Sequence, residues 1–121
     1  MGKTILLVDD TRSMRKMVAA VLHGAGYIIE EAGDGEEALV KAKAQVFDLV
    51  VTDHNMPRMD GVTLVGFLRQ IADYDDVAII VLSTENSADL KAKGREAGAT
   101  GWMAKPFDPE KMLAIVRQFI D

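Results

Sequence analysis

The chain has 121 residues, of which 49% are hydrophobic and 27% charged, and it contains no cysteine. These values are typical of a globular chain with its own core, and they exclude a disordered chain, a disulfide framework and a thiolate metal site. With 14 basic and 19 acidic residues the net charge is -5, which gives no general attraction to nucleic acid or anionic lipid. No stretch approaches the roughly 18 apolar residues that indicate a membrane span, and the N-terminus lacks a secretion signal. We therefore expect one cytoplasmic domain over residues 1–121.

The N-terminal third begins with a continuous apolar run, residues 4–8 (TILLV), which is typical of a strand buried on both faces. A helix is expected over about residues 12–24, with Thr11 as its N-cap and Gly24 or Gly26 at its end. Helical spacing predicts which apolar side chains face inward: Met14, Met17, Val18, Val21 and Leu22. A second strand is expected over residues 27–31.

The middle of the chain repeats this alternation. A turn at Asp34-Gly35 leads into a helix whose expected inward residues are Ala38, Leu39 and Ala42. Residues 47–52 (FDLVVT) predict a third strand. After an eight-residue loop, Asp60 is the expected N-cap of a helix that carries Leu64, Val65 and Leu68.

The C-terminal part adds two strands, over residues 77–82 and 100–104. The helix between them, about residues 87–97, has few apolar anchors and contains Gly94, so we expect it to be the least tightly docked. Asp108 caps a last helix with Pro109 in its first turn. That helix carries the apolar residues Met112, Val116, Phe119 and Ile120.

Five strands that alternate with five helices through short connections predict an α/β fold of three layers. The strands form a parallel sheet, and right-handed crossovers place helices on both of its faces. No repeat, low-complexity segment or linker interrupts the pattern.

Aspartates stand at the ends of two of these strands. Asp9 and Asp10 follow the first strand and Asp53 follows the third. Ligands of open parallel sheets bind outside the carboxyl ends of the strands, so these acids share a pocket if the two strands are neighbours. Crowded carboxylates repel one another and need a compensating cation. Oxygen-only ligation by a few carboxylates suits Mg²⁺.

Two further polar residues are expected at the same edge of the sheet. Lys105 follows the fifth strand and Ser83 ends the fourth. A carboxylate nucleophile, a metal site, an ammonium and a hydroxyl are the groups that phosphoryl transfer requires. Asp53 needs no general base because a carboxylate is already ionised at neutral pH. The absence of a catalytic histidine is therefore no objection.

Four segments in this order, "LLVDD", "LVVTDHNMPRMDG", "VLSTE" and "GWMAKPF", resemble the receiver domain of two-component response regulators. The resemblance covers essentially the whole chain and is strongest to stand-alone chemotaxis regulators of the CheY type. It implies a doubly wound, flavodoxin-like sheet with strand order 2-1-3-4-5.

The resemblance also implies roles for individual residues. Asp53 would accept a phosphoryl group from a phosphohistidine of a sensor histidine kinase. Mg²⁺ would be bound by Asp10, Asp53 and the main-chain carbonyl of Asn55, with Asp9 acting mainly through water. Ser83 and Lys105 would bind the phosphoryl oxygens, and the bond between Lys105 and Pro106 would be cis.

A switch follows from the same resemblance. Phosphorylation would draw Ser83 toward its new acceptor, and Trp102 on the fifth strand would rotate into the space that opens. The fourth helix, fifth strand and fifth helix would then present the signal to a partner such as a flagellar motor switch protein. Asn55 and Glu85 stand where the family tunes loss of the phosphoryl group. Such a protein is expected to act as a monomeric switch that promotes its own phosphorylation and dephosphorylation, not as a classical enzyme.

Other classes remain to be weighed. A metal-dependent phosphatase on a similar sheet requires an Asp-x-Asp pair after the first strand, which "VDDT" does not supply. A flavin or nucleotide carrier requires an uncharged Ser/Thr/Gly-rich loop where Asp9 and Asp10 stand. A receiver-like scaffold that no longer takes phosphate would normally lack one member of the set, and none is missing. Because the chain ends just after the fifth helix, it is expected either to act alone or to be a receiver domain trimmed from a larger regulator.

Overall fold

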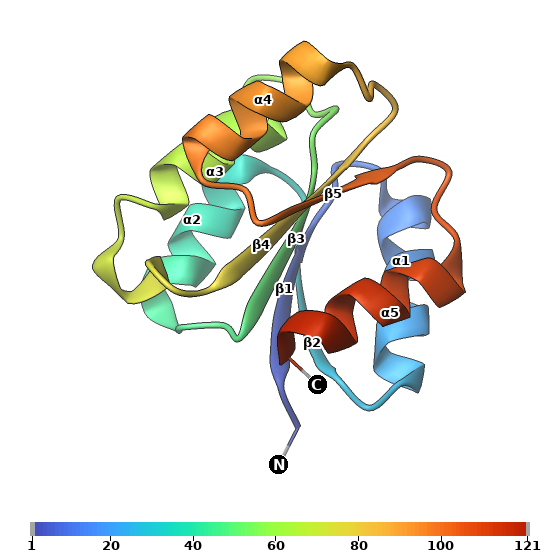
Figure 1. Ribbon diagram of the computed structural model, residues 1–121. Coiled ribbons are helices and arrows are strands. Elements are labelled where there is room, and N and C mark those ends of the chain that lie inside the picture. The colour runs from blue at the N-terminus through green and yellow to red at the C-terminus, as the bar shows by residue number, and fades with distance from the viewer. Residues whose placement is uncertain (1, 121) are drawn as a thin grey trace.

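The computed structural model describes residues 2–120 as a five-stranded parallel sheet between two layers of helices (Figure 1). The expected domain limits, residues 1 and 121, lie outside the described part. The strands are β1 (Thr4–Val8), β2 (Ile28–Ala32), β3 (Leu49–Asp53), β4 (Ala78–Ser83) and β5 (Gly101–Ala104). The α-helices are α1 (Arg12–Gly24), α2 (Gly35–Ala44), α3 (Gly61–Leu68), α4 (Ala88–Ala97) and α5 (Pro109–Ile120), with a short 3-10 helix at Ala72–Tyr74.

The strand order is β2-β1-β3-β4-β5, and every neighbouring pair is parallel. This confirms the expected flavodoxin-like α/β fold. Strand β2 lies on one side of β1, and β3 lies on the other side. The direction in which successive strands are added therefore reverses between β1 and β3, and ligands of such sheets bind at this point.

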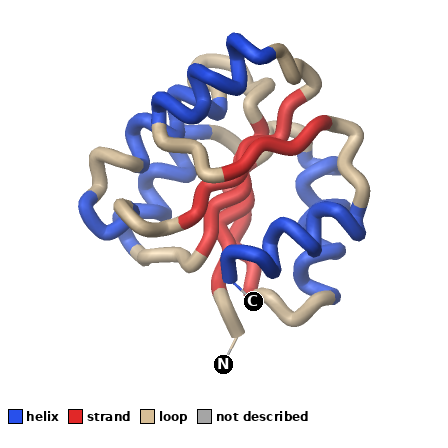
Figure 2. The backbone as a smooth tube through the Cα atoms, viewed as in Figure 1, coloured by secondary structure: helices blue, strands red, loops and turns tan. Residues whose placement is uncertain are grey.

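Side chains that alternate along each strand divide the core into two layers. Ile5 and Leu7 of β1 point into one buried cluster, with residues of α1 and α5, whereas Leu6 and Val8 point into the other, with residues of α2 and α3. Figures 1 and 2 show the same arrangement, with α1 and α5 on one face of the sheet and α2, α3 and α4 on the other. Strands buried on both faces explain the nearly continuous apolar runs of the sequence.

Helix starts are fixed mostly by side chains, as expected from the sequence. Asp34 accepts a hydrogen bond from the Glu37 amide at the start of α2, and Asp60 accepts one from the Thr63 amide at the start of α3. Thr11 is the N-cap residue of α1, as expected, but its side chain makes no capping hydrogen bond. The Thr11 amide donates to Asp9 Oδ1 at 2.8 Å.

Some expected burial is also wrong at helix edges. Met17 of α1 is 55% exposed and Phe119 of α5 is 37% exposed, as expected for side chains at the border of an apolar stripe. Strands β2, β3, β4 and β5 each begin one or two residues later than expected, so Tyr27, Phe47, Val77 and Thr100 precede their strands. Within the described residues, no helix is both long and apolar enough to cross a membrane.

Helix α4 is held mainly at its C-terminal end. Gly94 is its only buried residue, in agreement with the weak apolar pattern. The Arg69 guanidinium at the end of α3 donates to the Gly98 carbonyl at 2.8 Å and to the Thr100 hydroxyl at 3.2 Å. The same guanidinium donates to the carbonyl oxygens of Tyr74 and Val77. One side chain thus ties the segment after α4 to α3 and to the chain that enters β4.

Candidate functional site

The three aspartates meet at the carboxyl edge of the sheet. Val8 of β1 pairs with Thr52 of β3, so Asp9 and Asp53, the next residues, are neighbours across the two strands. One carboxylate oxygen from each of Asp9, Asp10 and Asp53 lies within 4.8 Å of the others. Asp9 and Asp53 are each 2% exposed, whereas Asp10 faces solvent. The strand order therefore brings together the acids that the sequence singled out.

Burial and mutual repulsion make this cluster unfavourable for negative charge. Desolvation raises the pKa of Asp9 above its ordinary value, and the charges of Asp53 and Asp10 raise it further. The Thr11 amide and the Lys105 ammonium act in the opposite direction. On balance the pKa of Asp9 is raised, so a further positive charge at the cluster would stabilise its ionised form.

Lys105 supplies a cation at the centre of the site. It follows β5 directly, its amide donates to the Ser83 carbonyl at 2.8 Å, and its ammonium forms an ion pair with Asp53. Only 15% of the Lys105 side chain and 2% of the Asp53 side chain are exposed. The peptide bond from Lys105 to Pro106 is cis. The buried carboxylate of Asp53, at the carboxyl end of β3, thus forms an ion pair with an ammonium that follows β5, two strands away in the sheet.

Ser83 is fully buried at the end of β4. Its Oγ accepts a hydrogen bond from the Glu85 amide at 2.9 Å. Within residues 2–120 the Ser83 hydroxyl donates no hydrogen bond, so its proton is available to an oxygen bound at Asp53. Ser83 pairs with Ala104, the residue before Lys105, which places the hydroxyl-bearing and ammonium-bearing residues on adjacent strand ends.

Asn55 joins the two loops that border the site. Its amide donates to Asp53 Oδ1 at 3.2 Å, and its side-chain Oδ1 accepts from both the amide and the hydroxyl of Thr84, at 3.0 and 3.2 Å. Thr84, the residue after Ser83, thus orients the Asn55 side chain.

Gly61 is a site residue that the sequence did not reveal, because a glycine after an N-cap aspartate is read first as part of a cap. A Cβ at Gly61 would lie 2.6 Å from the Asp53 carbonyl oxygen and 2.8 Å from His54 Cα. Only glycine therefore allows the start of α3 to approach the Asp53 backbone this closely.

Glu85 and Trp102 lie outside the acid cluster. The Glu85 carboxylate accepts a hydrogen bond from the Ser87 hydroxyl, and within residues 2–120 no hydrogen bond or ion pair joins it to Asp53. Trp102 is partly buried on β5 and packs against the core layer of α2 and α3. Its ring centroid lies 6.0 Å from that of His54, the residue after Asp53.

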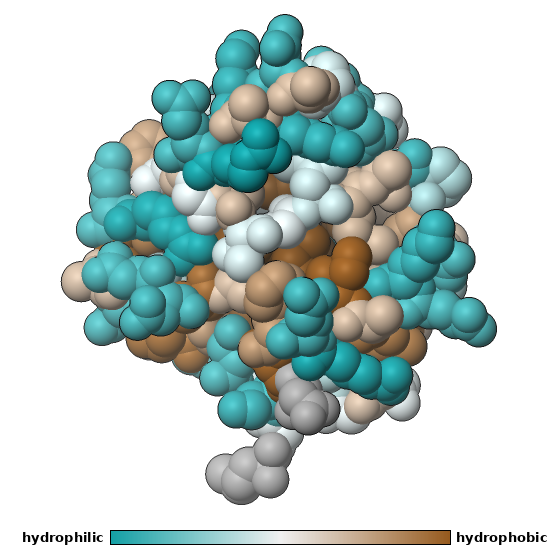
Figure 3. Space-filling model, in the orientation of Figure 1, coloured by the Kyte–Doolittle hydropathy of each residue, from teal (hydrophilic) through white to brown (hydrophobic). Residues whose placement is uncertain are grey.

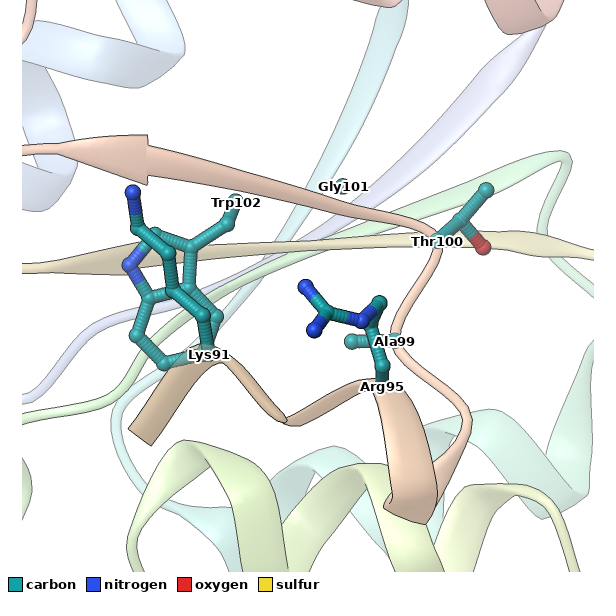
Figure 4. A pocket seen from close by; sticks show the side chains of 6 residues that line it. All are labelled: Lys91, Arg95, Ala99, Thr100, Gly101 and Trp102. Carbon is teal, nitrogen blue, oxygen red and sulfur yellow. The ribbon is translucent and has the colours of Figure 1, made fainter. Parts of the chain in front are cut away.

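Two hollows border Trp102. One, of about 120 Å³, lies between α4 and β5, where Lys91 and Arg95 line it together with the indole (Figure 4). The other, of about 280 Å³, lies between β5 and α5 and is lined by Met103, Pro106 and Ile115, among others. Figure 3 shows apolar side chains near the middle of this face, with polar side chains around them.

The donor set of the acid cluster fits a small, hard divalent cation. Carboxylate oxygens are the ligands that Mg²⁺ prefers, and three of them converge here. Burial raises the pKa of Asp9 and the neighbouring carboxylates raise it further, so a cation bound here would favour the ionised form of Asp9. The chain offers no cysteine, so a soft thiolate-binding metal does not suit the site.

Comparison with known proteins agrees with this geometry. Residues 5–117 match the response regulator receiver domain. The chain belongs to this family. Receiver domains are the signalling switches of two-component systems that histidine kinases phosphorylate, and they bind Mg²⁺ at their acidic site.

Solved receiver domains superimpose closely on this one. The chemotaxis protein CheY4 of Vibrio cholerae is 42% identical, with a TM-score of 0.95 over 98% of this chain and 99% of that chain. The receiver domain of a sensor histidine kinase from Pseudomonas aeruginosa is 28% identical, with a TM-score of 0.91 over 99% of this chain and 98% of that chain. That structure is described with a magnesium ion coordinated in the active-site cleft.

Curated relatives that contain this receiver domain are longer proteins. Response regulator MprA of Mycolicibacterium vanbaalenii is 39% identical over 116 residues, which are 96% of this chain and 49% of that protein. A gliding motility regulatory protein of Myxococcus xanthus is 38% identical over 117 residues, which are 97% of this chain and 15% of that protein. The chain thus spans about half or less of these relatives.

Proposed function

We propose that this receiver domain takes a phosphoryl group onto Asp53 from a phosphohistidine of a sensor histidine kinase. The observation that carries the proposal is the ion pair between Lys105 and Asp53 beside the carboxylates of Asp9 and Asp10. An ordinary structural ion pair would not need two further acids next to it. A site that binds a divalent cation and a phosphoryl group needs all four residues.

In the proposed reaction an Asp53 carboxylate oxygen attacks the phosphorus atom of the phosphohistidine. A P–O bond to Asp53 forms, the P–N bond to the imidazole breaks, and the departing imidazole keeps the electron pair and takes up a proton. The Lys105 ammonium then pairs with one phosphoryl oxygen, and the Ser83 hydroxyl donates a hydrogen bond to another. Asp53 starts ionised and needs no base.

Mg²⁺ would be held by Asp10, Asp53 and the Asn55 main-chain carbonyl, with Asp9 acting through water. When bound, it supplies positive charge that offsets the carboxylates and the phosphoryl oxygens. Asn55 is suited to this role because its amide already contacts Asp53 and its side chain is tied to Thr84. Asn55 and Glu85 are further proposed to tune the lifetime of the phosphorylated state.

Covalent labelling tests the proposal. With Mg²⁺ and acetyl phosphate, intact-mass spectrometry is expected to show the added mass of one phosphoryl group, and borohydride trapping should locate it at Asp53. Asp53→Asn should remove the labelling, whereas Asp73→Asn, an exposed carboxylate in the 3-10 helix, should keep it. Labelling that persists in Asp53→Asn would reject Asp53 as the acceptor.

Lys105→Ala should separate the labelling of Asp53 from the conformational response to it. We expect it to bind Mg²⁺ and to accept label slowly, but to lose the change in Trp102 fluorescence that labelling causes in the wild type. The reason is that the ammonium would connect the phosphoryl oxygens to the end of β5, the strand that carries Trp102. A Lys105→Ala protein with a normal fluorescence response would show that Lys105 does not have this role.

We further propose that the phosphorylated chain signals through the face formed by α4, β5 and α5, as a monomeric regulator of chemotaxis that contacts a flagellar motor switch protein. Support comes from the match over 98% of this chain and 99% of the chemotaxis protein CheY4, and from the two hollows beside Trp102. Deletion of the gene should alter swimming reversals, and Asp53→Asn should not restore them. Normal swimming in the deletion strain would contradict the chemotaxis role and leave the phosphoacceptor proposal standing.

A further inference from the structure

The Trp102 ring packs against α4 at Gly94. Glycine within a helix is unfavourable relative to alanine, so a glycine at the buried position 94 of α4 indicates a packing constraint. A Cβ at Gly94 would lie 2.7 Å from Cζ3 and 3.1 Å from Cε3 of Trp102, closer than real Cβ contacts allow. The six-membered part of the indole therefore rests directly on the helix backbone. Gly66 of α3, by contrast, has nothing within 4 Å of the corresponding position.

Asn86 fixes the other side of the same ring. The indole Nε1–H donates to Asn86 Oδ1 at 3.0 Å. Figure 4 shows the indole projecting from β5 toward α4, which agrees with a ring held between these two elements. A hydrogen bond to the five-membered part and close packing on the six-membered part together fix both the position of the ring and its rotation about the Cβ–Cγ bond.

Asn86 also connects the ring to the phosphoacceptor site. It belongs to the loop between β4 and α4, in which the preceding residue, Glu85, donates its amide hydrogen to Ser83 Oγ at 2.9 Å. A displacement of Ser83 toward Asp53 therefore displaces Glu85, and with it Asn86. The contact between the indole and Gly94 lies outside this loop and need not change.

We propose that Gly94 and Asn86 are positioning residues that hold the Trp102 ring in one place between β5 and α4, and that activation releases the Asn86 bond without rotating the ring. The first part concerns the protein at rest. The second part rests on the proposed phosphorylation of Asp53. In this proposal the loop between β4 and α4 moves relative to a stationary Trp102 ring, in place of the ring rotation that the family resemblance implies.

The indole N–H signal tests the Asn86 contact, and because the chain has a single tryptophan that signal is unique in a ¹⁵N-labelled sample. Asn86→Ala should shift the signal and accelerate its exchange with water. Asn86→Asp, which keeps an acceptor oxygen, should restore slow exchange. Ser87→Ala, which changes the neighbouring helix cap but no contact of the indole, serves as the control for loop disturbance. An Asn86→Ala spectrum with an unchanged indole signal would overturn the Asn86 contact.

Stability tests the Gly94 contact, with Gly66 as a matched control. Helix propensity alone predicts that alanine at either position lowers the unfolding equilibrium constant, by roughly fivefold. Gly66→Ala is expected to do so, whereas Gly94→Ala should raise that constant and shift the indole signal. In a Trp102→Ala background, Gly94→Ala should become as favourable as Gly66→Ala. Equal effects of the two substitutions in the wild-type background would overturn the role of Gly94.

Beryllofluoride with Mg²⁺ tests the second part. In the wild type, the indole N–H signal should move toward its position in Asn86→Ala, while the nuclear Overhauser contacts between the Gly94 α-protons and ring positions ε3 and ζ3 persist. Loss of these contacts would show that the ring rotates and would overturn the fixed ring. Asp53→Asn should show neither change. Failure of acetyl phosphate to label the wild type would reject the proposed phosphoacceptor, whereas the Asn86 and Gly94 variants decide the resting position of the ring independently.

Discussion

At the scale of single residues, Tyr74 shows how one buried polar group joins distant segments. Its side chain is fully buried, its hydroxyl lies 2.7 Å from the Gln45 carbonyl and 3.1 Å from the Ala42 carbonyl, and it accepts from the Phe47 amide at 3.3 Å. Burial raises the pKa of Tyr74, so the hydroxyl keeps its proton. The tyrosine stands in the polar stretch "ADYDD", which carries no periodic signal, so sequence patterns do not single it out.

Replacement of this hydroxyl is the first prediction. Tyr74→Phe keeps the ring but leaves the Phe47 amide and the end of α2 without a buried partner, which should lower the free energy of unfolding by about 1–3 kcal/mol. Urea denaturation followed by circular dichroism measures the change. Labelling of Asp53 should be unaffected. A loss below a few tenths of a kcal/mol would mean that water replaces the hydroxyl.

At the scale of elements, α1 is joined to β2 by ion pairs. Glu31 accepts from Arg15 and Lys16, each at 2.9 Å. Burial alone would raise the pKa of Glu31, but the hydrogen bonds and charges of Lys16 and Arg15 exceed this effect, and the pKa is lowered from its ordinary value of 4.5. Periodicity predicted both elements, yet it could not predict this pairing, because the partners are 15 and 16 residues apart.

The sign of this shift gives the second prediction. A carboxylate whose pKa is lowered by folding stabilises the protein above its unfolded pKa, and this contribution disappears as the pH falls through the folded pKa. Glu31→Gln should therefore cost about 1 kcal/mol at pH 7 and almost nothing near pH 3. Urea midpoints of wild type and variant at the two pH values measure it. An equal difference at both pH values would assign the effect to packing instead of charge.

At the scale of the whole molecule, the sheet topology was predictable and the site followed from it. Continuous apolar runs alternating with amphipathic helices require a covered parallel sheet, and the family resemblance supplied the strand order, so the convergence of Asp9, Asp10 and Asp53 could be expected. What could not be expected are contacts that depend on close approach of backbones and rings. Gly61 against Asp53 and Gly94 against Trp102 are such contacts, since a glycine is compatible with many turns and caps.

Because the three aspartates converge, the fold without Mg²⁺ contains negative charges that repel one another. This repulsion leads to the third prediction. Asp10 is exposed, and its charge raises the pKa of Asp9. Without Mg²⁺, Asp10→Asn should raise the melting temperature by about 3–6 °C, because repulsion among the carboxylates is reduced. Added Mg²⁺ should stabilise the variant less than the wild type. Thermal unfolding with and without Mg²⁺ measures both effects, with the exposed Glu96→Gln as the control. A lower melting temperature in the variant would contradict net repulsion at the cluster.

The unequal attachment of α4 has a mechanical consequence. Arg69 anchors the carbonyl of Gly98, and the Ala99 amide donates to the Gly94 carbonyl, so the last turn of the helix is closed by its own cap and bound to the end of α3. The first turn is attached mainly through the Ser87 cap. The first turn of α4 should therefore move whenever the preceding loop is pulled, while the turn from Gly94 to Gly98 stays in place. Amide hydrogen exchange should accordingly be faster at residues 90–92 than at residues 95–98, and uniform protection along the helix would contradict this difference.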